Sequence, residues 1–219
     1  MIELLNTDCM EYMASQPDNA FDLAVVDPPY GIKQDGRNNH TRSVLAKANS
    51  YKGNARYDQF KPDKEYFLEL KRVSTNQIIW GGNHLASLFD AGSSCWLVWD
   101  KLNGENDFAD CELAYTSFKT AVRRFVFQWQ GMIQGYGGNK NNNELKIHPN
   151  QKPVKLYDWI YHNYAKPGQR ILDTHLGSGS SAIAAHYYGL EFVGCEIDKD
   201  YYAAAVERFN QATKQEQLF

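Results

Sequence analysis

The chain has 219 residues, of which 43% are hydrophobic and 22% are charged, and its net charge at pH 7 is −3. This length suits a single domain, and no apolar run reaches the roughly 18 residues that a membrane span requires. The first ten residues contain Glu3 and Asp8 instead of the basic and then apolar stretch of a signal peptide. We therefore expect one soluble, cytoplasmic domain over residues 1–219. The four widely spaced cysteines predict neither a zinc site nor a disulfide framework.

Short apolar runs alternate with amphipathic stretches along the chain, which is typical of a parallel sheet flanked by helices. In chain order, strands are predicted at 2–5, 23–26, 77–80, 96–99, 112–116, 125–128, 171–173 and 192–196. Helices are predicted at 8–15, 64–74, 83–89, 155–164, 180–188 and 199–212. Residues 131–143, rich in glycine and asparagine, show no period and are predicted to form a mobile loop.

A double-proline turn, Asp27-Pro28-Pro29-Tyr30, follows the predicted strand 23–26. It should lie at the carboxyl edge of the sheet, where open α/β folds bind their ligands. The prolines fix the backbone and remove two N–H donors, so the turn can present a carboxylate and free carbonyl groups. Asp27 and the Pro28 carbonyl could accept the two hydrogens of a base amino group, and Tyr30 offers a ring for stacking. The alternative is an ordinary turn at the end of a strand.

A second candidate site lies where the predicted strand 171–173 ends in Asp173 and runs through a glycine turn, Gly177-Ser178-Gly179, into a helix. Such a turn lets the backbone approach a nucleotide-like cofactor closely. Glu196 ends the next predicted strand about 20 residues later, where an acidic residue can bind both hydroxyls of a ribose. A nicotinamide dinucleotide is disfavoured because the third glycine of its binding motif is missing.

A basic segment at residues 33–56 carries six basic residues and one acidic residue, although the whole chain is acidic. It predicts either a loop that contacts DNA phosphates or a solvated loop without that role. Its basic residues are Lys33, Arg37, Arg42, Lys47, Lys52 and Arg56.

Together these motifs resemble the amino-methylating DNA methyltransferases, specifically the permuted class in which the catalytic motif precedes the cofactor motif. The double-proline turn matches the catalytic motif, and His148-Pro149-Asn150-Gln151-Lys152-Pro153 matches the family's His-Pro-x-Gln-Lys-Pro stretch. Asp8-Cys9 resembles the adenine-contacting turn of the cofactor site, and Trp80-Gly81-Gly82-Asn83 resembles a further family turn. The resemblance spans residues 2–207.

The resemblance implies a Rossmann-like methyltransferase fold, with a mostly parallel seven-stranded sheet, helices on both faces and a circularly permuted motif order. It implies S-adenosylmethionine as cofactor, with Lys152 beside the methionine portion, and no metal. The family usually has Asp-Pro-Phe where this chain has Asp173-Thr174-His175, so His175 is either a polar contact to the cofactor carboxylate or a neutral filler. The implied cofactor-binding residues are Asp8, Cys9, Lys152, Asp173, His175, Gly177, Ser178, Gly179 and Glu196.

The implied reaction is methylation of the N6 amino group of adenine in a specific sequence of double-stranded DNA, with the base flipped out of the helix. Within the family, Asp in the first position of the catalytic motif favours adenine, while Ser is commoner for cytosine. The alternative functions are methylation of the cytosine N4 amino group and DNA binding by a catalytically silent subunit. The tail 213–219 resembles a sliding-clamp peptide through Gln215, Leu218 and Phe219, unless these residues pack on the domain or are disordered. The sequence leaves open the oligomeric state, a homodimer included, and whether a separate nuclease accompanies the enzyme.

Overall fold

A computed structural model describes residues 1–32, 58, 61–89, 92–104, 109–130, 133–135 and 143–214. The main strands are β1 (Ile2–Leu5), β2 (Phe21–Val26), β3 (Ser74–Trp80), β4 (Trp96–Asp100), β5 (Cys111–Thr116), β6 (Arg123–Val126), β9 (Arg170–Asp173) and β10 (Glu191–Cys195). A small hairpin joins β7 (Trp129–Gln130) and β8 (Ile133–Gln134). The helices are α1 (Cys9–Ala14), α2 (Lys64–Val73), α3 (Gly82–Leu85) with a 3-10 turn (Ala86–Leu88), α4 (Val154–Tyr164), α5 (Ser180–Tyr188) and α6 (Lys199–Thr213).

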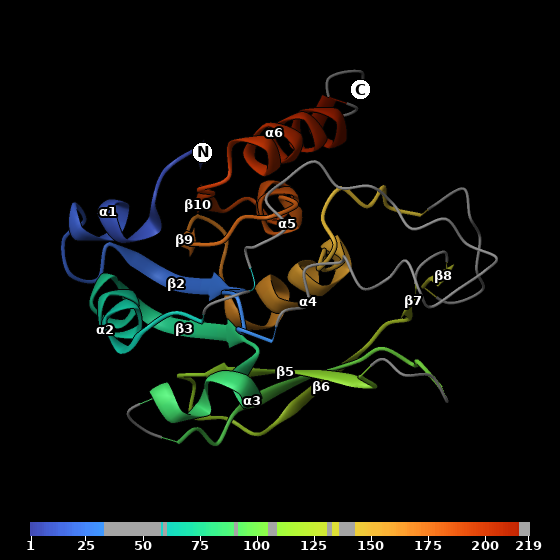
Figure 1. Cartoon of the computed structure of the whole chain (residues 1–219), viewed down its shortest axis with the longest axis horizontal. Helices are drawn as coiled ribbons and strands as arrows, with labels where there is room; N and C mark the ends of the chain where they lie inside the picture. The colour runs from blue at the N-terminus through green and yellow to red at the C-terminus, as the bar shows by residue number, and fades with distance from the viewer. Residues whose placement is uncertain are drawn as a thin grey trace.

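The main strands form one mixed sheet in the order β1-β10-β9-β2-β3-β5-β4-β6 (Figure 1). Among the strands that the structure describes, only β5 runs antiparallel to its neighbours β3 and β4. The sheet has eight strands within the described residues, where seven were expected. The mostly parallel α/β architecture is as predicted.

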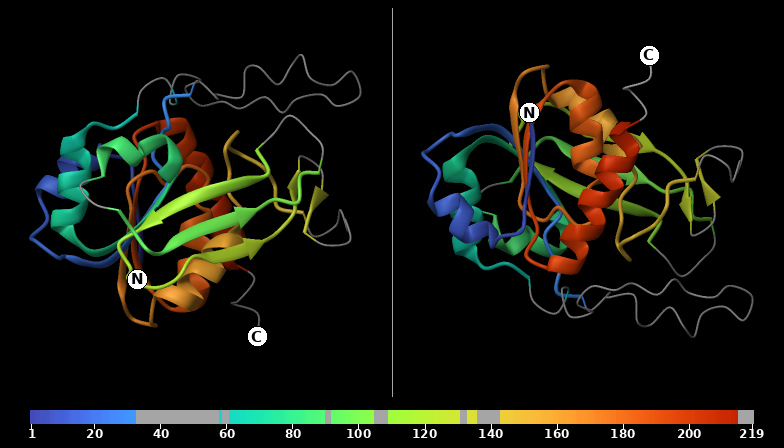
Figure 2. Two further views of the ribbon diagram at one scale, coloured as in Figure 1. Left: turned by 90° about the horizontal axis from the view of Figure 1, so that it is seen from below. Right: turned by 90° about the horizontal axis from the view of Figure 1, so that it is seen from above.

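Helices cover both faces of the sheet, and two separate cores lie between them. Leu23 and Val25 of β2 point into the core beneath α4 and α5, whereas Ala24 and Val26 point into the core beneath α1 and α2. Figure 2 shows the two groups of helices on opposite sides of the central strands. Because residues 23–26 of β2 are buried on both faces of the sheet, they form a continuous apolar run and not an alternating one.

Several predicted elements differ in detail from the structure. The strands expected at 23–26 and 77–80 begin two and three residues earlier, because β2 and β3 already pair at Phe21 and Ser74. The strand expected at 125–128 begins two residues earlier, as β6, because it pairs in register with β4, with Val98 opposite Arg124. The expected helix 83–89 is split into α3 and a 3-10 turn. The expected loop 131–143 contains β8, which pairs with β7 although the segment has no strand period. The basic segment 33–56 and residues 215–219 of the tail lie outside the described residues, and α6 extends into the tail as far as Thr213.

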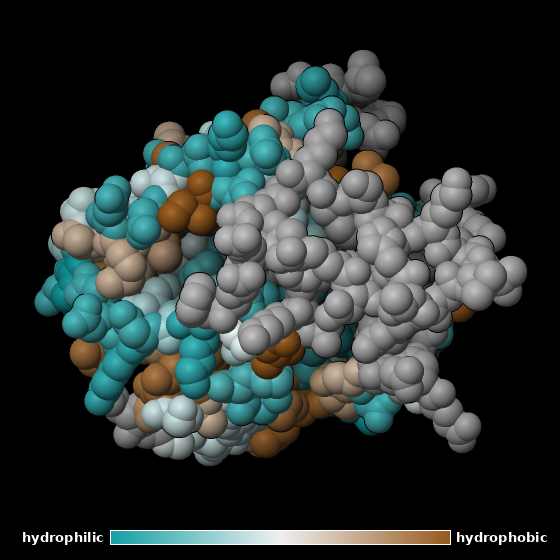
Figure 3. Space-filling view, viewed as in Figure 1, coloured by the Kyte–Doolittle hydropathy of each residue, from teal (hydrophilic) through white to brown (hydrophobic). Residues whose placement is uncertain are grey.

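The exposed surface is mixed in character. Figure 3 shows hydrophilic side chains interspersed with separate hydrophobic patches on the described part of this face. Single large apolar side chains such as Ile197 and Val122 are exposed, as is normal for a folded domain. Within the described ranges, no helix is both long enough and apolar enough to cross a membrane.

The centre of the sheet positions the candidate site. β9 is flanked by β10 on one side and by β2 on the other, and all three strands are parallel. The order of strands therefore continues from β9 towards both edges of the sheet. Such a point is the topological switch point, where open α/β folds bind their ligands. Asp27, just after β2, and Asp173, at the end of β9, lie at adjacent carboxyl ends.

Candidate active site

The double-proline turn is held from two sides. Asp27 Oδ1 accepts a hydrogen bond from the Tyr30 hydroxyl at 2.6 Å, and Asp27 Oδ2 accepts one from Lys152 Nζ at 2.5 Å. Behind the turn, Asp58 Oδ1 accepts the backbone N–H groups of Tyr30 and Gly31 at 2.7 and 2.9 Å. The carboxylate of Asp27 is therefore fixed at the sheet edge, with both of its oxygens engaged.

The ring of Tyr30 packs against the turn that follows β3. It stacks on His84 with ring centres 5.2 Å apart and planes 16° apart. At Gly81, which has φ of +72°, an added Cβ would lie 2.1 Å from a carbon of the Tyr30 ring, so only glycine fits there. One face of the ring expected to stack on a base is therefore covered by His84 in this structure.

Lys152 is the centre of a buried network of alternating charges. Its side chain is 4% exposed, and its ammonium lies 3.1 Å from Glu112 Oε2 and 3.1 Å from the Tyr30 hydroxyl, in addition to its bond with Asp27. Glu112 is also paired with Lys101. The Trp80 and Tyr30 ring centres lie 5.5 and 5.6 Å from Lys152 Nζ, so aromatic faces complete a box suited to a cation.

Burial and charge pairing set the ionisation of this network in different directions. Burial raises the pKa of Asp27, despite the opposing effect of the Lys152 ammonium and with a further contribution from the charge of Glu112. Burial would also raise the pKa of Glu112, but Lys152 and Lys101 outweigh it and hold that pKa at about 2. Burial would lower the pKa of Lys152, but the two carboxylates outweigh it and the pKa is raised. At neutral pH, Glu112 is therefore a fixed anion and Lys152 a fixed cation.

The other polar residues of the segment 148–153 shape the loop that presents Lys152. Gln151 Oε1 accepts the backbone N–H of Ile147 at 3.0 Å, and the Gln151 carbonyl accepts the indole N–H of Trp129 at 2.9 Å. His148 Nδ1 accepts the backbone N–H of Asn150, and burial lowers the His148 pKa to about 3. His148 is therefore neutral at physiological pH, and the charge of the segment is delivered by Lys152.

Asp173 ends β9 beside the double-proline turn. Its Oδ1 accepts the backbone N–H of His175 at 3.1 Å, and its Oδ2 accepts the Ser181 hydroxyl at 2.5 Å. Burial outweighs both hydrogen bonds and raises the Asp173 pKa to about 7, with a further contribution from the nearby negative charge of Asp27. Two carboxyl groups thus converge on one region of the sheet edge.

The glycine turn and Glu196 form the other part of the predicted cofactor site. Gly177 and Gly179 have φ of +52° and +73°, and Gly179 leads into α5. Glu196 accepts the backbone N–H of Gly177 at Oε2 and that of Asp198 at Oε1, both at 2.9 Å. Each oxygen retains a lone pair that can accept a ribose hydroxyl. This donor and acceptor set fits the nucleoside part of S-adenosylmethionine.

The remaining predicted cofactor residues, Asp8, Cys9 and His175, lie near Glu196 and Asp173. Asp8 caps α1 by accepting the backbone N–H of Met10 at 2.7 Å. Burial raises the pKa of Cys9 to about 12, so its thiol stays protonated, and burial lowers the pKa of His175 to about 4. His175 is therefore neutral, with Nδ1 hydrogen-bonded to Thr174 at 2.9 Å.

Arg208 of α6 connects the glycine turn to the loop that presents Lys152. It donates to the carbonyl of Ser178 at 2.7 Å and to the hydroxyl of Ser180 at 2.9 Å. It also pairs with Glu144 Oε2 at 2.6 Å, while Glu144 Oε1 accepts the first backbone N–H of α4, from Val154. Arg208 therefore ties the glycine turn to the segment that precedes α4 and carries Lys152.

Sequence reasoning did not identify several residues of this site. Arg208, Asp58, Lys101 and Tyr157 carry no motif, and their partners come from distant parts of the chain. Tyr157 of α4 is buried, and after burial the nearby carboxylates of Asp173 and Asp27 raise its pKa further. Glu112 had one usable signal, because it is a carboxylate at the start of the mostly apolar strand predicted at 112–116.

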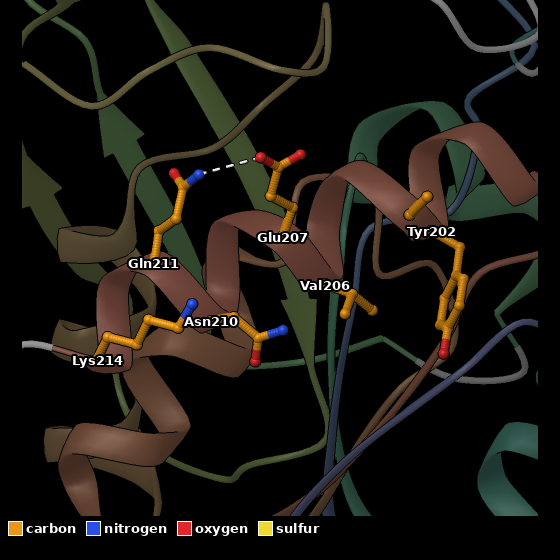
Figure 4. A pocket seen from close by; sticks show the side chains of 7 residues that line it. Tyr202, Val206, Glu207, Asn210, Gln211 and Lys214 are labelled. Carbon is orange, nitrogen blue, oxygen red and sulfur yellow. Dashed lines mark hydrogen bonds between the residues drawn. The ribbon is translucent and has the colours of Figure 1, made fainter.

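A surface depression on α6 is unrelated to these residues (Figure 4). Gln211 Nε2 donates to Glu207 Oε1 across it at 3.1 Å. None of the predicted site residues lines it. Within the part of the chain that the structure describes, no group of three side chains could hold a metal ion. The lining residues are Tyr202, Ala203, Val206, Glu207, Asn210, Gln211 and Lys214.

Comparison with known proteins agrees with this geometry. A family model described as DNA methylase matches residues 98–207, half of the chain. The type II methyltransferase M.HinfI of Haemophilus influenzae is 23% identical over 249 residues, which cover 95% of this chain and 68% of M.HinfI.

Two solved structures show the same fold. M1.HpyAVI in complex with S-adenosylmethionine has a TM-score of 0.59 at 19% identity and covers 95% of this chain and 100% of its own. The cytosine-N4-specific PvuII DNA methyltransferase has a TM-score of 0.60 at 15% identity, with coverages of 95% and 86%. The predicted methyltransferase fold, family and cofactor are thereby confirmed. The chain belongs to the N4/N6 DNA methylase family, whose members use S-adenosylmethionine.

Proposed function

We propose that this protein methylates the N6 amino group of adenine in double-stranded DNA, with Asp27 as the group that holds the amino nitrogen. The observation that carries the proposal is the position of Asp27 at the switch point of the sheet, next to Asp173 and fixed by Tyr30 and Lys152. Cytosine-N4 methylation is the second candidate, because a structural relative, the PvuII enzyme, has that specificity. The Asp at the first position of the turn favours adenine.

The double-proline turn would make the amino nitrogen reactive. That nitrogen is a poor nucleophile because its lone pair is delocalised into the ring. Asp27 and the Pro28 carbonyl accept its two hydrogens and stabilise the positive charge that develops on it. S-adenosylmethionine supplies an electrophilic methyl group when bound. Because burial raises the pKa of Asp27, this carboxylate is also suited to take up the proton that the methylated nitrogen loses.

Access to the amino group requires the base to leave the DNA stack, at a cost of a few kcal/mol. Stacking on Tyr30 would offset about 1 to 3 kcal/mol of this cost once His84 or the base has adjusted. On the cofactor side, Glu196 would bind the ribose, the glycine turn would approach the nucleoside, and Asp173 and His175 would line the methionine end. Asp8 and Cys9 would border the adenine.

The partners belong to the proposal as well. Double-stranded DNA would be bound through the basic segment 33–56, and its recognition sequence would be read there and in the loop 131–143. A sliding clamp would be bound through Gln215, Leu218 and Phe219. The basic segment and these three residues lie outside the described part of the chain. Two copies of the chain could act together, with or without a partner nuclease, without any change to the chemistry at Asp27.

The test is Asp27→Ala, compared with Asp18→Asn, which changes an exposed carboxylate on the surface. Transfer of labelled methyl groups to genomic DNA should fall roughly 100-fold or more in Asp27→Ala, because the main acceptor for the developing charge is gone. Binding of S-adenosylmethionine, measured by calorimetry, should persist in both variants. Mass spectrometry of the nucleosides should show N6-methyladenine. Unchanged turnover of Asp27→Ala would refute the role of Asp27. Detection of N4-methylcytosine in place of N6-methyladenine would show that the substrate is cytosine, the second candidate.

A further inference from the structure

The ammonium of Lys152 occupies the place that the proposed function assigns to the target amino group. Asp27 Oδ2 accepts from Lys152 at 2.5 Å, and Asp27 Oδ1 accepts from the Tyr30 hydroxyl at 2.6 Å. Lys152 Nζ also lies 3.1 Å from the Tyr30 oxygen. A base amino group can donate both of its hydrogens well only if one of these donors gives way.

Lys152 needs another anionic partner if it leaves Asp27. Its side chain is only 4% exposed, so water cannot solvate the ammonium, and a buried cation without a partner is strongly unfavourable. Glu112 Oε2 lies 3.1 Å from the same ammonium. A shift of Lys152 towards Glu112 would release Asp27 Oδ2 while keeping the cation paired. The box formed by Trp80 and Tyr30 around the ammonium would still contain it.

We propose that Glu112 is a positioning residue that takes over the ammonium of Lys152 when the target amino group binds to Asp27. This inference rests on the proposed function of Asp27. Glu112 acts through Lys152 and does not itself touch the base. Without Glu112, Lys152 would stay on Asp27, where it competes with the amino group and repels the positive charge that develops on the nitrogen during transfer.

Glu112 is well placed for this role because its position is rigid. It lies on β5, between β3 and β4 in the sheet, and is paired in register with Trp99. Lys101, at the end of β4, holds the other carboxylate oxygen of Glu112. The partner that would receive the ammonium is therefore anchored in the sheet, whereas Lys152 lies in the loop directly before α4.

The experiment uses the full chain with Glu112→Gln, which keeps the size of the side chain and removes its charge. We expect kcat to fall by about tenfold or more while the Kd for S-adenosylmethionine stays within about twofold. The matched control is Glu69→Gln on α2, since Glu69 is as exposed as Glu112 (28% against 25%) and is also ion-paired, with Arg72. The control should match the wild type. Glu112→Asp keeps the charge and should retain more activity than Glu112→Gln.

Two further measurements separate this role from a purely structural one. Removal of the Glu112 charge lowers the pKa of Asp27, so the acid limb of the kcat profile should move to lower pH in Glu112→Gln. In a Lys152→Met background, Glu112→Gln should cost little more activity, because Glu112 acts through Lys152.

Full activity of Glu112→Gln, an unmoved acid limb, or additive losses in the double variant would each overturn the inference. If Asp27→Ala is inactive while Glu112→Gln is fully active, the inference alone fails. If Asp27→Ala keeps its turnover, the proposed function fails first.

Discussion

Replacing Asp173 by Asn should change how the stability of the protein depends on pH. Asp173 is 1% exposed, and burial raises its pKa from 3.8 to about 7. The folded state therefore binds this proton more tightly than the unfolded state, so the stabilisation is complete below about pH 4 and is lost as the pH rises through about 7. The total effect is on the order of 4 kcal/mol, of which about 2.5 kcal/mol is lost between about pH 5 and pH 8.

The assay is urea unfolding of the wild type and of Asp173→Asn across that pH range, followed by circular dichroism. All other titrating groups are shared, so the difference between the two curves isolates Asp173. The amide can still accept from the backbone N–H of His175, which preserves the local turn. The wild type should lose stability relative to the variant as the pH rises. Parallel curves would show that Asp173 is ionised in the folded protein at pH 5 and would refute the reasoning from burial.

Two other changes test the Arg208 ion pair and the DNA contact. Arg208→Ala leaves the largely buried Glu144 without its charged partner and should lower the free energy of unfolding in urea by about 3 to 5 kcal/mol. The double variant with Glu144→Gln should recover part of this loss, and equal losses in the single and double variants would exclude the ion-pair explanation. Neutralising Lys47, Lys52 and Arg56 together with Gln should reduce the slope of log Kd for DNA against log salt by about three. An unchanged slope would place the phosphate contacts elsewhere on the protein.

Local sequence patterns were sufficient to place most of the helices and strands, because each pattern reports which face of an element is buried. The helix at α5 was recognisable from its glycine turn and its run of small apolar residues, and the structure gives the predicted bounds, Ser180–Tyr188. The order of strands could not be read in this way. β2 pairs with β9 through contacts such as Leu23 with Ile171, which join distant parts of the chain and leave no local pattern.

The same distinction applies to the site. The double-proline and glycine turns were predictable because their chemistry is contained in a few consecutive residues. Lys152 was recognised by its motif, but its contact with Asp27 depends on how the loop before α4 folds back over the sheet. Arg208 and Glu112 are single charged residues whose importance appears only when their partners are known. Long-range ion pairs are set by the tertiary fold, and no spacing rule along the chain encodes them.

The permuted order of the motifs has a simple physical consequence for this chain. What brings the two halves of the site together is the position of β2 beside β9, and this pairing does not depend on which strand comes first in the sequence. The connections must only remain long enough to return to the same edge of the sheet. The segment that carries Lys152 lies between the two halves in the sequence, and the helix that follows it, α4, packs on α5. Lys152 reaches Asp27 from this separate segment, so its proposed exchange between Asp27 and Glu112 would make entry of the base depend on a residue outside both turns.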